Sequence, residues 1–280
     1  MIDSILVAGA AGTQGGSVVD ALLAAEGGEF DVRGLTRRPE SDAAAALRDR
    51  GVSVVEGDMT DRPAMDRAVA DADGVFGVTA GETGDVERAQ GTTLAEAAAA
   101  ADVEHFVFSS GGNADRRPGI PHVDAKHDVE RRLAELGLPV TVLRPHSFMQ
   151  NFERQRAEIL DGRLAFPIPE GKTHVLVDAA DIGRFAARAF ADPERYAGVT
   201  VELAAERLTL EELAAVFADV TGRDVEPVRV PIDSMPGGMG AFMEFMADAE
   251  ADPDRLREEF DFEPRGLREY LVDAGWKNAA

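Results

Sequence analysis

Apolar runs of strand length alternate with stretches of helical periodicity through the first half of the chain. The runs are rich in Val, Ile, Leu and Phe, whereas the stretches between them repeat apolar residues at helical spacing or are rich in Ala. Such alternation is typical of α/β proteins with a doubly wound, parallel sheet. We expect strands at residues 4–8, 30–36, 52–55, 74–79, 105–110 and 140–145, and helices at 17–23, 43–49, 63–70, 87–101 and 122–136.

The alternation becomes less regular beyond about residue 151. Strands are expected at 173–177, 199–203 and 225–230 and helices at 180–190 and 210–220, before a glycine-rich break and short acidic helices. The pattern contains no internal repeat and no long polar linker. It predicts a doubly wound domain over residues 1–151, closely joined to a smaller α/β C-terminal lobe over residues 152–280. Strands of this lobe can return to the main sheet.

Three glycines, Gly9, Gly12 and Gly15, follow the first apolar run. A glycine at a strand end allows the backbone to turn tightly and to approach a pyrophosphate, which the free N–H groups of the next helix bind. A glycine-rich turn that packs closely and binds nothing is the alternative, because three glycines alone are not specific. The residues that follow favour a dinucleotide-binding turn.

The second expected strand ends in Arg37 and Arg38, and the first acidic residue after it is Glu40. An NAD-binding unit carries an Asp or Glu about 20 residues after the glycines, whereas an NADP-binding unit supplies an arginine for the 2′-phosphate. A guanidinium fork suits a phosphate dianion. The sequence therefore favours NADP over NAD, with two solvated loop arginines as the alternative.

Polar residues also follow the next three expected strands. Asp58 lies in a short turn that can reach an adenine, or that only connects a strand to a helix. Thr79 would flank a cofactor ribose through its backbone, and Ser109 brings a hydroxyl to the carboxyl end of the sheet. Ligands of doubly wound sheets bind at this end, so the three residues are candidate cofactor contacts.

His122 and Lys126 are four residues apart and lie on one face of an expected helix. A lysine there can bond nicotinamide-ribose hydroxyls and lower the pKa of a neighbouring group. The chain has only two other lysines, Lys172 and Lys277, which favours a function for Lys126 over a solvated side chain. His122 is a candidate proton-transfer or substrate-binding group, or else a capping or surface histidine.

The balance of charges is strongly acidic, with 29 Lys and Arg against 52 Asp and Glu and a net charge of −23. Arginine largely replaces lysine, and we expect a protein adapted to a salt-rich cytoplasm, where counterions screen repulsion between carboxylates. The charge argues against direct binding to nucleic acids or anionic membranes. No run of about 20 apolar residues predicts a membrane span. The first strand begins almost at once, with no charged n-region or cleavage site before it, so we expect a cytoplasmic protein. Cysteine is absent and the five histidines are scattered, so no metal site is expected.

Several of these motifs, in this order and spacing, resemble the NmrA-like family, whose members are atypical short-chain dehydrogenases/reductases. The resemblance rests on the segments 9–16, 36–39, 57–58, 109–111, 122–126 and 144–151, and it continues more loosely to the C-terminus. It implies an NADP-binding Rossmann domain and a smaller lobe for a substrate or partner. It also implies that Thr13, Gln14 and Gly15 meet the pyrophosphate, Arg37 the 2′-phosphate and Lys126 the nicotinamide ribose.

One departure from the superfamily bears on catalysis. Its usual proton donor is a Tyr four residues before the Lys, and this chain has His122 there, while Tyr196 and Tyr270 lie far along the sequence. Members of the NmrA-like family either reduce quinones and related carbonyl compounds with NADPH or act as redox sensors with little turnover.

Two hypotheses follow for this chain. The first is an NADPH-dependent oxidoreductase that acts on a quinone or small carbonyl compound, with Lys126 and His122 as catalytic candidates. The acceptor is expected near Phe148, Met149 and residues 235–246, although the Met/Phe-rich composition of the last segment favours core or lobe-interface packing. The alternative is a non-catalytic NADP-binding sensor with a regulatory protein partner. A sugar-nucleotide epimerase is a third and weaker hypothesis, and the sequence predicts no oligomeric state.

Overall fold

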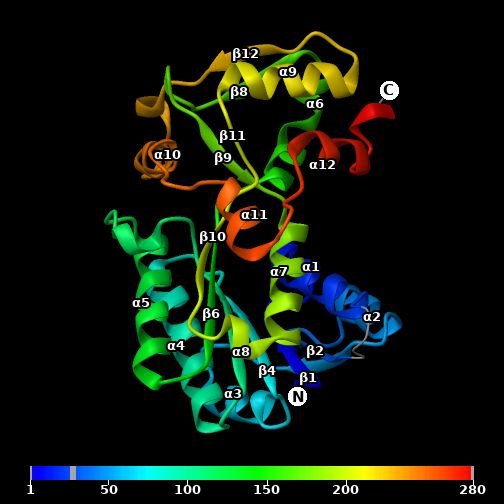
Figure 1. Ribbon diagram of the computed structural model, residues 1–280, viewed down its shortest axis with the longest axis vertical. Coiled ribbons are helices and arrows are strands. Elements are labelled where there is room, and N and C mark those ends of the chain that lie inside the picture. The colour runs from blue at the N-terminus through cyan, green and yellow to red at the C-terminus, as the bar shows by residue number, and fades with distance from the viewer. Residues whose placement is uncertain (1, 26–29, 279–280) are drawn as a thin grey trace. The chain divides into compact units, whose positions relative to one another are not determined.

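A computed structural model describes residues 2–25 and 30–278 of the chain (Figure 1). Up to residue 145, strands and helices alternate as the apolar pattern predicts. The strands are β1 (Ser4–Val7), β2 (Asp31–Thr36), β3 (Ser53–Glu56), β4 (Gly74–Val78), β5 (His105–Ser109) and β6 (Val140–Pro145). The helices are α1 (Thr13–Leu23), α2 (Asp42–Asp49), α3 (Arg62–Val69), α4 (Gly84–Ala100) and α5 (Pro121–Leu136).

These strands form a seven-stranded sheet with the order β10-β6-β5-β4-β1-β2-β3, in which β10 is Thr200–Leu203. The pairs from β3 to β6 are parallel. The chain starts at the middle of the sheet, winds outward through β2 and β3, and then returns to place β4 on the other side of β1. This reversal opens a crevice at the carboxyl ends of β1 and β4, where doubly wound folds bind ligands. The doubly wound fold is thereby confirmed.

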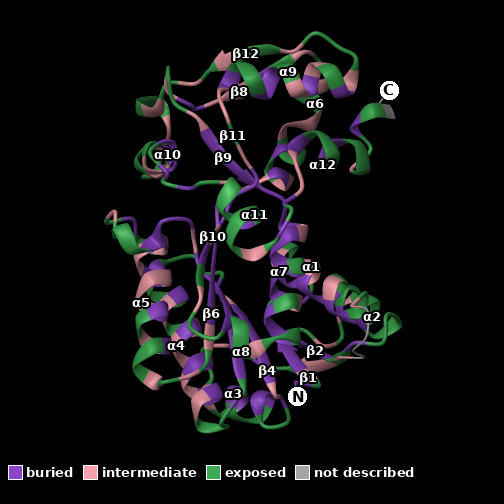
Figure 2. Ribbon diagram, viewed as in Figure 1, coloured by how far each residue is buried: buried purple, intermediate pink, exposed green. Residues whose placement is uncertain are grey.

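Helices cover both faces of the sheet. Figure 1 shows α3, α4 and α5 on one face and α1, α2 and α7 (Ala179–Ala191) on the other. The strands are therefore buried on both sides, and Ile5, Leu6 and Val7 are 0% exposed (Figure 2). Two-sided burial explains why the strands appear in the sequence as continuous apolar runs.

The chain divides into two compact units. The first contains residues 1–144 and 180–201, and the second contains residues 145–179 and 202–280. Residues 180–201, which the sequence analysis placed in the C-terminal lobe, thus pack with the first unit. A Cβ added at Gly183 of α7 would lie 2.1 Å from the carbonyl oxygen of Ser17, so α7 lies directly against α1. The amide of Gly198 also donates to the carbonyl of Val140 at 2.7 Å, at the start of β6.

The second unit consists of short elements around an aromatic core. The rings of Phe152, Phe217 and Trp276 are fully buried, and the centroid of Phe217 lies 5.1 Å from those of the other two. Its strands are β7 (Ser147–Phe148), β8 (Arg163–Phe166), β9 (His174–Val177), β11 (Glu206–Leu208) and β12 (Glu226–Arg229). Its helices are α6 (Arg156–Leu160), α9 (Leu210–Thr221), α10 (Met239–Ala247), α11 (Asp254–Phe260) and α12 (Leu267–Asp273), while α8 (Pro193–Tyr196) belongs to the first unit.

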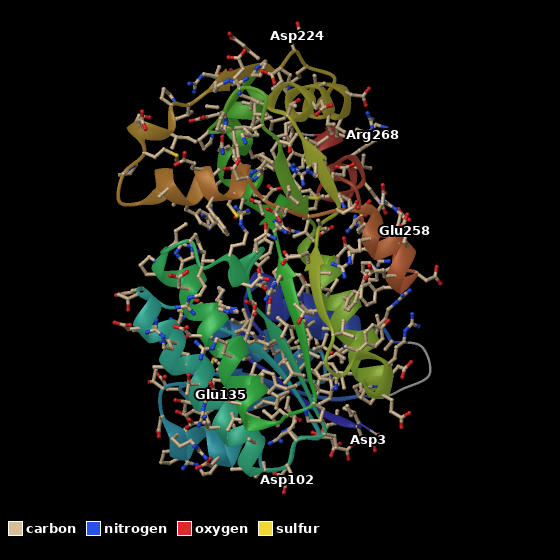
Figure 3. All side chains as sticks on the ribbon, turned by 60° about the vertical axis from the view of Figure 1, so that its left-hand side comes forward. Asp3, Asp102, Glu135, Asp224, Glu258 and Arg268 are labelled. Carbon is tan, nitrogen blue, oxygen red and sulfur yellow. The ribbon has the colours of Figure 1, made fainter. Side chains whose placement is uncertain are left out.

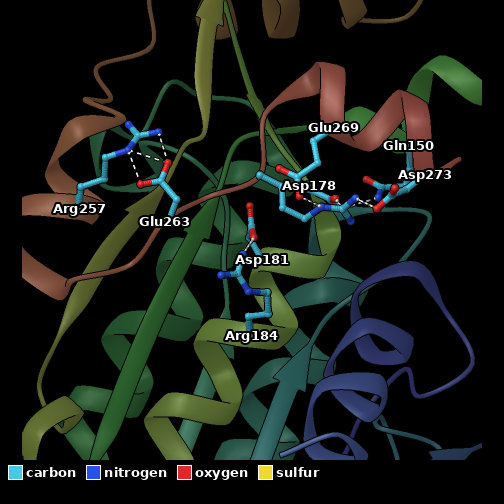
Figure 4. Close-up of polar contacts among 9 residues, drawn as sticks. Gln150, Asp178, Asp181, Arg184, Arg257, Glu263, Glu269 and Asp273 are labelled. Atoms are coloured by element: carbon cyan, nitrogen blue, oxygen red, sulfur yellow. Dashed lines mark hydrogen bonds and ion pairs between the residues drawn. The ribbon is translucent and has the colours of Figure 1, made fainter. Parts of the chain in front are cut away.

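A buried carboxylate, Asp178, joins three segments of the second unit (Figure 4). Gln150 donates to it from Nε2 at 2.7 Å, and Nη1 of Arg265 lies 2.9 Å from its Oδ2. Gln150 belongs to the segment 144–151 that carries part of the family resemblance. Its hydrogen bonds hold the segment after β6 against the end of β9.

Charged side chains project from the outer surface, among them Asp3, Asp102 and Glu135 in the first unit and Asp224 and Glu258 in the second (Figure 3). Along residues 2–25 and 30–278, no helix is long and apolar enough to cross a membrane. Within the same ranges, no group of three or more His, Asp or Glu side chains is arranged to hold a metal ion.

Candidate functional site

The turn after β1 has the close backbone approach that its glycines predict. Gly9 has a positive φ of 65°, and its carbonyl accepts from the amide of Gly12 at 2.8 Å. A Cβ at Gly15 would lie 2.2 Å from the carbonyl oxygen of Gly9, which no real side chain tolerates. Thr13, Gln14 and Gly15 form the first turn of α1, whose amides have no partner within the helix. The turn therefore presents backbone donors and a helix N-terminus, which fit a pyrophosphate.

A pocket of about 220 Å³ opens beside this turn and lies wholly in the first unit. Five of the candidate cofactor residues line it: Gly9, Gly12, Arg37, Arg38 and Asp58. A second hollow shares Arg37 and Asp58 and extends to Arg67 of α3. The carboxyl ends of β1, β2 and β3 thus bring together the residues that the sequence assigns to the adenosine half of a dinucleotide.

Arg37 and Arg38 are exposed, and within the described ranges neither lies within 4.0 Å of a carboxylate. Their backbone is fixed: the amide of Arg38 donates to Thr36 Oγ1 at 3.1 Å, and Ser41 Oγ, which caps α2, donates to the carbonyl of Arg38 at 2.8 Å. In a chain with 52 acidic residues, two neighbouring guanidinium groups without an ion-pair partner are available to an anionic ligand.

Asp58 is held in the turn after β3. Its Oδ1 accepts from the amide of Thr60 at 2.9 Å and from the hydroxyl of Thr60 at 2.7 Å. These hydrogen bonds, together with the charge of Arg37, lower the pKa of the Asp58 carboxyl. Both bonds use Oδ1, so the position suits an ionised carboxylate that presents Oδ2 to a donor such as an adenine amino group.

Thr79 and Lys126 meet at the carboxyl end of β4, together with Glu87 of α4. Nζ of Lys126 lies 3.0 Å from Glu87 Oε2, and it donates to Thr79 Oγ1 at 3.0 Å and to the Thr79 carbonyl at 3.3 Å. The hydroxyl of Thr79 donates to the same Glu87 oxygen at 2.8 Å. Thr79 and Glu87 are buried, and the Lys126 side chain is 14% exposed. The ammonium group is therefore fixed next to Val78 and Ala80, which line the pocket.

The other candidates lie at the neighbouring strand end and on α5. The buried hydroxyl of Ser109 donates to Gln14 Oε1 at 2.5 Å, so the end of β5 is tied to the first turn of α1.

His122 is half-buried, one turn before Lys126. Burial lowers the pKa of His122, and Lys126 lowers it further, whereas Glu87 opposes both. His122 is therefore largely neutral at pH 7.

Two further residues at this edge of the sheet, Glu87 and Gln90, are not among the candidates that the sequence pattern predicts. Gln90 accepts from the amide of Ala80 at 3.1 Å and donates to its carbonyl at 3.2 Å, which clamps the segment after β4 beside the pocket. A signal for Glu87 was present: positions 87, 91, 94 and 98 fall on the buried face of α4, and Glu87 is the carboxylate among them. The acceptor site expected at Met149 needs correction, because this side chain is fully buried in the core of the second unit.

A model of the NmrA-like family matches residues 1–252. The chain belongs to this family. The "NmrA-like family domain-containing oxidoreductase FrzB" of Cladobotryum sp is 31% identical over 256 residues, which are 80% of this chain and 76% of the relative. The "NAD(P)H azoreductase" of Xenophilus azovorans is 30% identical over 273 residues, which are 93% of this chain and 92% of that protein.

Solved structures with this fold include two reductases. A triphenylmethane reductase of Citrobacter sp., complexed with NADP(H), has a TM-score of 0.83 and 22% identity, with 97% of this chain and 99% of that chain covered. The NADPH-dependent quinone oxidoreductase QOR2 of Escherichia coli, complexed with NADPH, has a TM-score of 0.81 and 22% identity, with 96% and 99% covered. The resemblance to the NmrA-like family is confirmed, and the chain is an NAD(P)-binding, Rossmann-type protein of an oxidoreductase family.

Proposed function

We propose that this protein is an NADPH-dependent reductase whose acceptor is a quinone or a related small carbonyl compound. The observation that carries the preference for NADPH is the pair of arginines, Arg37 and Arg38, that lines the pocket at the end of β2 without an ion-pair partner among the described residues. No acidic side chain occupies the strand end, where an NAD site needs one for the ribose hydroxyls. In a complex with NADPH, the negative charge at the end of β2 comes from the 2′-phosphate of the cofactor instead of from an acidic side chain.

The residues of the first unit divide into those that hold the cofactor and those that act near the reacting carbon. The amides of Thr13, Gln14 and Gly15 bind the pyrophosphate, and Arg37 binds the 2′-phosphate. Lys126, held at the end of β4, donates to the nicotinamide-ribose hydroxyls. When bound, the nicotinamide ring supplies a hydride to the acceptor.

His122 constrains the class of acceptor. Reduction of a simple ketone generates a strongly basic alkoxide, which needs a positioned acid, whereas a reduced quinone leaves as a stable anion that water can protonate. Burial holds the pKa of His122 below its usual value, so few molecules carry the imidazolium form at pH 7. A largely neutral histidine at this position favours quinones and conjugated carbonyl compounds. The name of the structurally similar quinone oxidoreductase supports the same class, and that of the azoreductase relative supports reduction with a nicotinamide cofactor.

Binding and turnover can be tested separately. We expect NADPH to bind more tightly than NADH in molar KCl, and NADPH to be oxidised when quinones are added. Tight binding without turnover on any quinone or aldehyde would instead support the alternative, a non-catalytic sensor. That alternative further requires oxidised and reduced cofactor to differ in affinity, or to change protease sensitivity or association with a protein partner.

A further inference from the structure

Glu87 is a carboxylate on a face of α4 that is otherwise apolar. It is 6% exposed, and its neighbours on this face include Gly91 and Leu94. Gly91 lies against α5 so closely that an added Cβ would be 2.4 Å from Val129. An ionised group in such a contact is unfavourable unless a partner compensates its charge. The hydroxyl of Thr79 donates to Glu87 at 2.8 Å, but a neutral donor does not compensate a full negative charge, so Glu87 requires a cationic partner.

The partner of Glu87 is Lys126, the lysine that the proposed function places on the nicotinamide ribose. An ammonium group has three donors. Nζ of Lys126 donates to Thr79 Oγ1 and to the Thr79 carbonyl oxygen, and it forms an ion pair with Glu87 Oε2 at 3.0 Å. The charge and the direction of the Lys126 side chain are thus set from α4 and β4 rather than from its own helix.

We propose that Glu87 is a positioning residue for Lys126, which supplies its countercharge and holds its ammonium group at the carboxyl end of β4, ready for the cofactor ribose. Ribose hydroxyls would replace the contacts to Thr79, of which the one to the carbonyl is the longest at 3.3 Å. The ion pair with Glu87 would remain, so the ammonium stays compensated while the cofactor binds. The inference rests on the proposed function, because it assigns Lys126 to the cofactor.

Groups from three elements surround Lys126. Glu87 faces it from α4, Thr79 of β4 is uncharged, and His122 interacts with it electrostatically on α5, where Asp124 and His127 are the titratable residues nearest in sequence. The loop after β5 packs on the lysine at Gly111, where an added Cβ would lie 3.5 Å from Cδ, and its residues 110–113 carry no titratable side chain. Without Glu87, the ammonium group would be buried without a countercharge, which is unfavourable.

The test compares Glu87→Gln with Glu130→Gln in molar KCl. Glu130 is a matched control, since both glutamate side chains are 8% exposed and Glu130 forms a buried ion pair with Arg144 at 2.7 Å. We expect both variants to lower the melting temperature. For Glu87→Gln alone, we expect the Kd of NADPH, measured by fluorescence at pH 7, to rise about ten-fold, because the ammonium group of Lys126 loses the carboxylate that holds it in place. The Kd of Glu130→Gln should stay within about two-fold of that of wild type.

Two further measurements keep the test decisive. Glu87→Asp retains the negative charge, so it should bind NADPH more tightly than Glu87→Gln does. If Glu87→Gln fails to fold, a folded Glu87→Asp that binds NADPH no better than Lys126→Ala would overturn the inference. In the protein without cofactor, NMR titration of His122 should show a lower pKa in Glu87→Gln than in wild type, because Glu87 raises this pKa.

The inference and the proposed function fail in different ways. An unchanged Kd of NADPH in Glu87→Gln, or an equal rise in Glu130→Gln, would overturn the positioning role while NADPH binding by wild type stands. Absence of NADPH binding by wild type at every pH would overturn the proposed function. The role of Glu87 toward a cofactor would fail with it, whatever the titration of His122 shows.

Discussion

Gly15 lies so close to Gly9 that a Cβ on Gly15 would be 2.2 Å from the Gly9 carbonyl oxygen. Gly16, the next residue, has room: its Cβ would lie 3.5 Å from the nearest atom, the carbonyl oxygen of Ala10. The pair offers a matched test of the turn. Gly15→Ala should lower the free energy of unfolding by about 1–3 kcal/mol, because the turn must shift to admit the methyl group. It should also abolish measurable NADPH binding, since the amides that face the pyrophosphate move with the turn.

Gly16→Ala should fold and bind NADPH as wild type does. Chemical denaturation and fluorescence titration of the two variants decide the question. Equal behaviour of Gly15→Ala and Gly16→Ala would show that the close approach to Gly9 does not shape the cofactor site.

Arg37 and Arg38 should determine the preference for NADPH. A charge-assisted hydrogen bond contributes about 1.5–3 kcal/mol, so Arg37→Ala should weaken NADPH binding about 10- to 100-fold. Binding of NADH, which has no 2′-phosphate, should change by less than about three-fold. Arg48→Ala is the control: Arg48 is exposed in the last turn of α2, and its loss changes the net charge equally. A parallel loss of NADPH and NADH affinity in Arg37→Ala would contradict this assignment.

His105 should make the first unit sensitive to acid. Its Nε2 lies 2.8 Å from Thr141 Oγ1, and this hydroxyl donates to the carbonyl of Tyr196, so it accepts the proton of Nε2–H. Nδ1 is buried without a partner among the described residues, and burial lowers the pKa of His105 from 6.5 to about 4. Between these pH values the unfolded chain binds a proton that the folded chain does not, so stability falls as the pH falls.

The loss attributable to His105 should reach about 3 kcal/mol at pH 4. His105→Gln retains a donor for Thr141 but does not titrate in this range. Its free energy of unfolding should therefore decline less than that of wild type between pH 6.5 and pH 4. Parallel declines in the two proteins would exclude His105 as a source of the acid sensitivity, and carboxylates would then account for all of it.

The sequence predicts most of the first unit because the features that identify its elements, apolar runs and the residues that follow them, are local or periodic along the chain. Strands buried on both faces must be apolar throughout, so β1 and β4–β6 stand out, and the positions of Gly9 and Arg37 relative to them follow from the spacing along the chain. The packing of α7 against α1 brings Gly183 against Ser17, and these residues are 166 positions apart in the sequence. A contact over this separation leaves no periodic pattern along the chain, so the sequence does not predict it. The strands β7 and β11 have only two and three residues, too short for an alternating pattern to be recognised.

The candidate site shows the same limit. The spacing from His122 to Lys126 predicts a shared helix face, but the ion pair between Lys126 and Glu87 joins α4 to α5 and arises only from tertiary packing. Glu87 stands in an alanine-rich helix, where a single acidic residue looks like an ordinary solvated one. Only the alignment of positions 87, 91 and 94 with the buried face distinguishes it.

Salt should stabilise this protein. At a net charge of −23, repulsion between surface carboxylates opposes folding, and molar salt reduces the Debye length to about 3 Å. The melting temperature should therefore rise by several degrees between low salt and molar KCl. Sucrose at equal osmolality is the control, because it stabilises by exclusion from the surface and does not screen charge. A melting temperature that is the same at both salt concentrations would contradict adaptation to a salt-rich environment.

The role of His122 can be determined by comparing the turnover of two acceptors, an aldehyde and a quinone, in one variant. If the histidine protonates the product, His122→Asn should lower kcat for an aldehyde by about 100-fold, the usual contribution of a positioned acid. Turnover of a quinone should fall far less, because the reduced quinone is stable as an anion and takes its proton from water. The binding of NADPH, measured separately, shows whether the substitution disturbs the neighbouring Lys126. Equal losses for both acceptors would assign His122 to binding or structure, and no loss for either would leave water as the sole proton source.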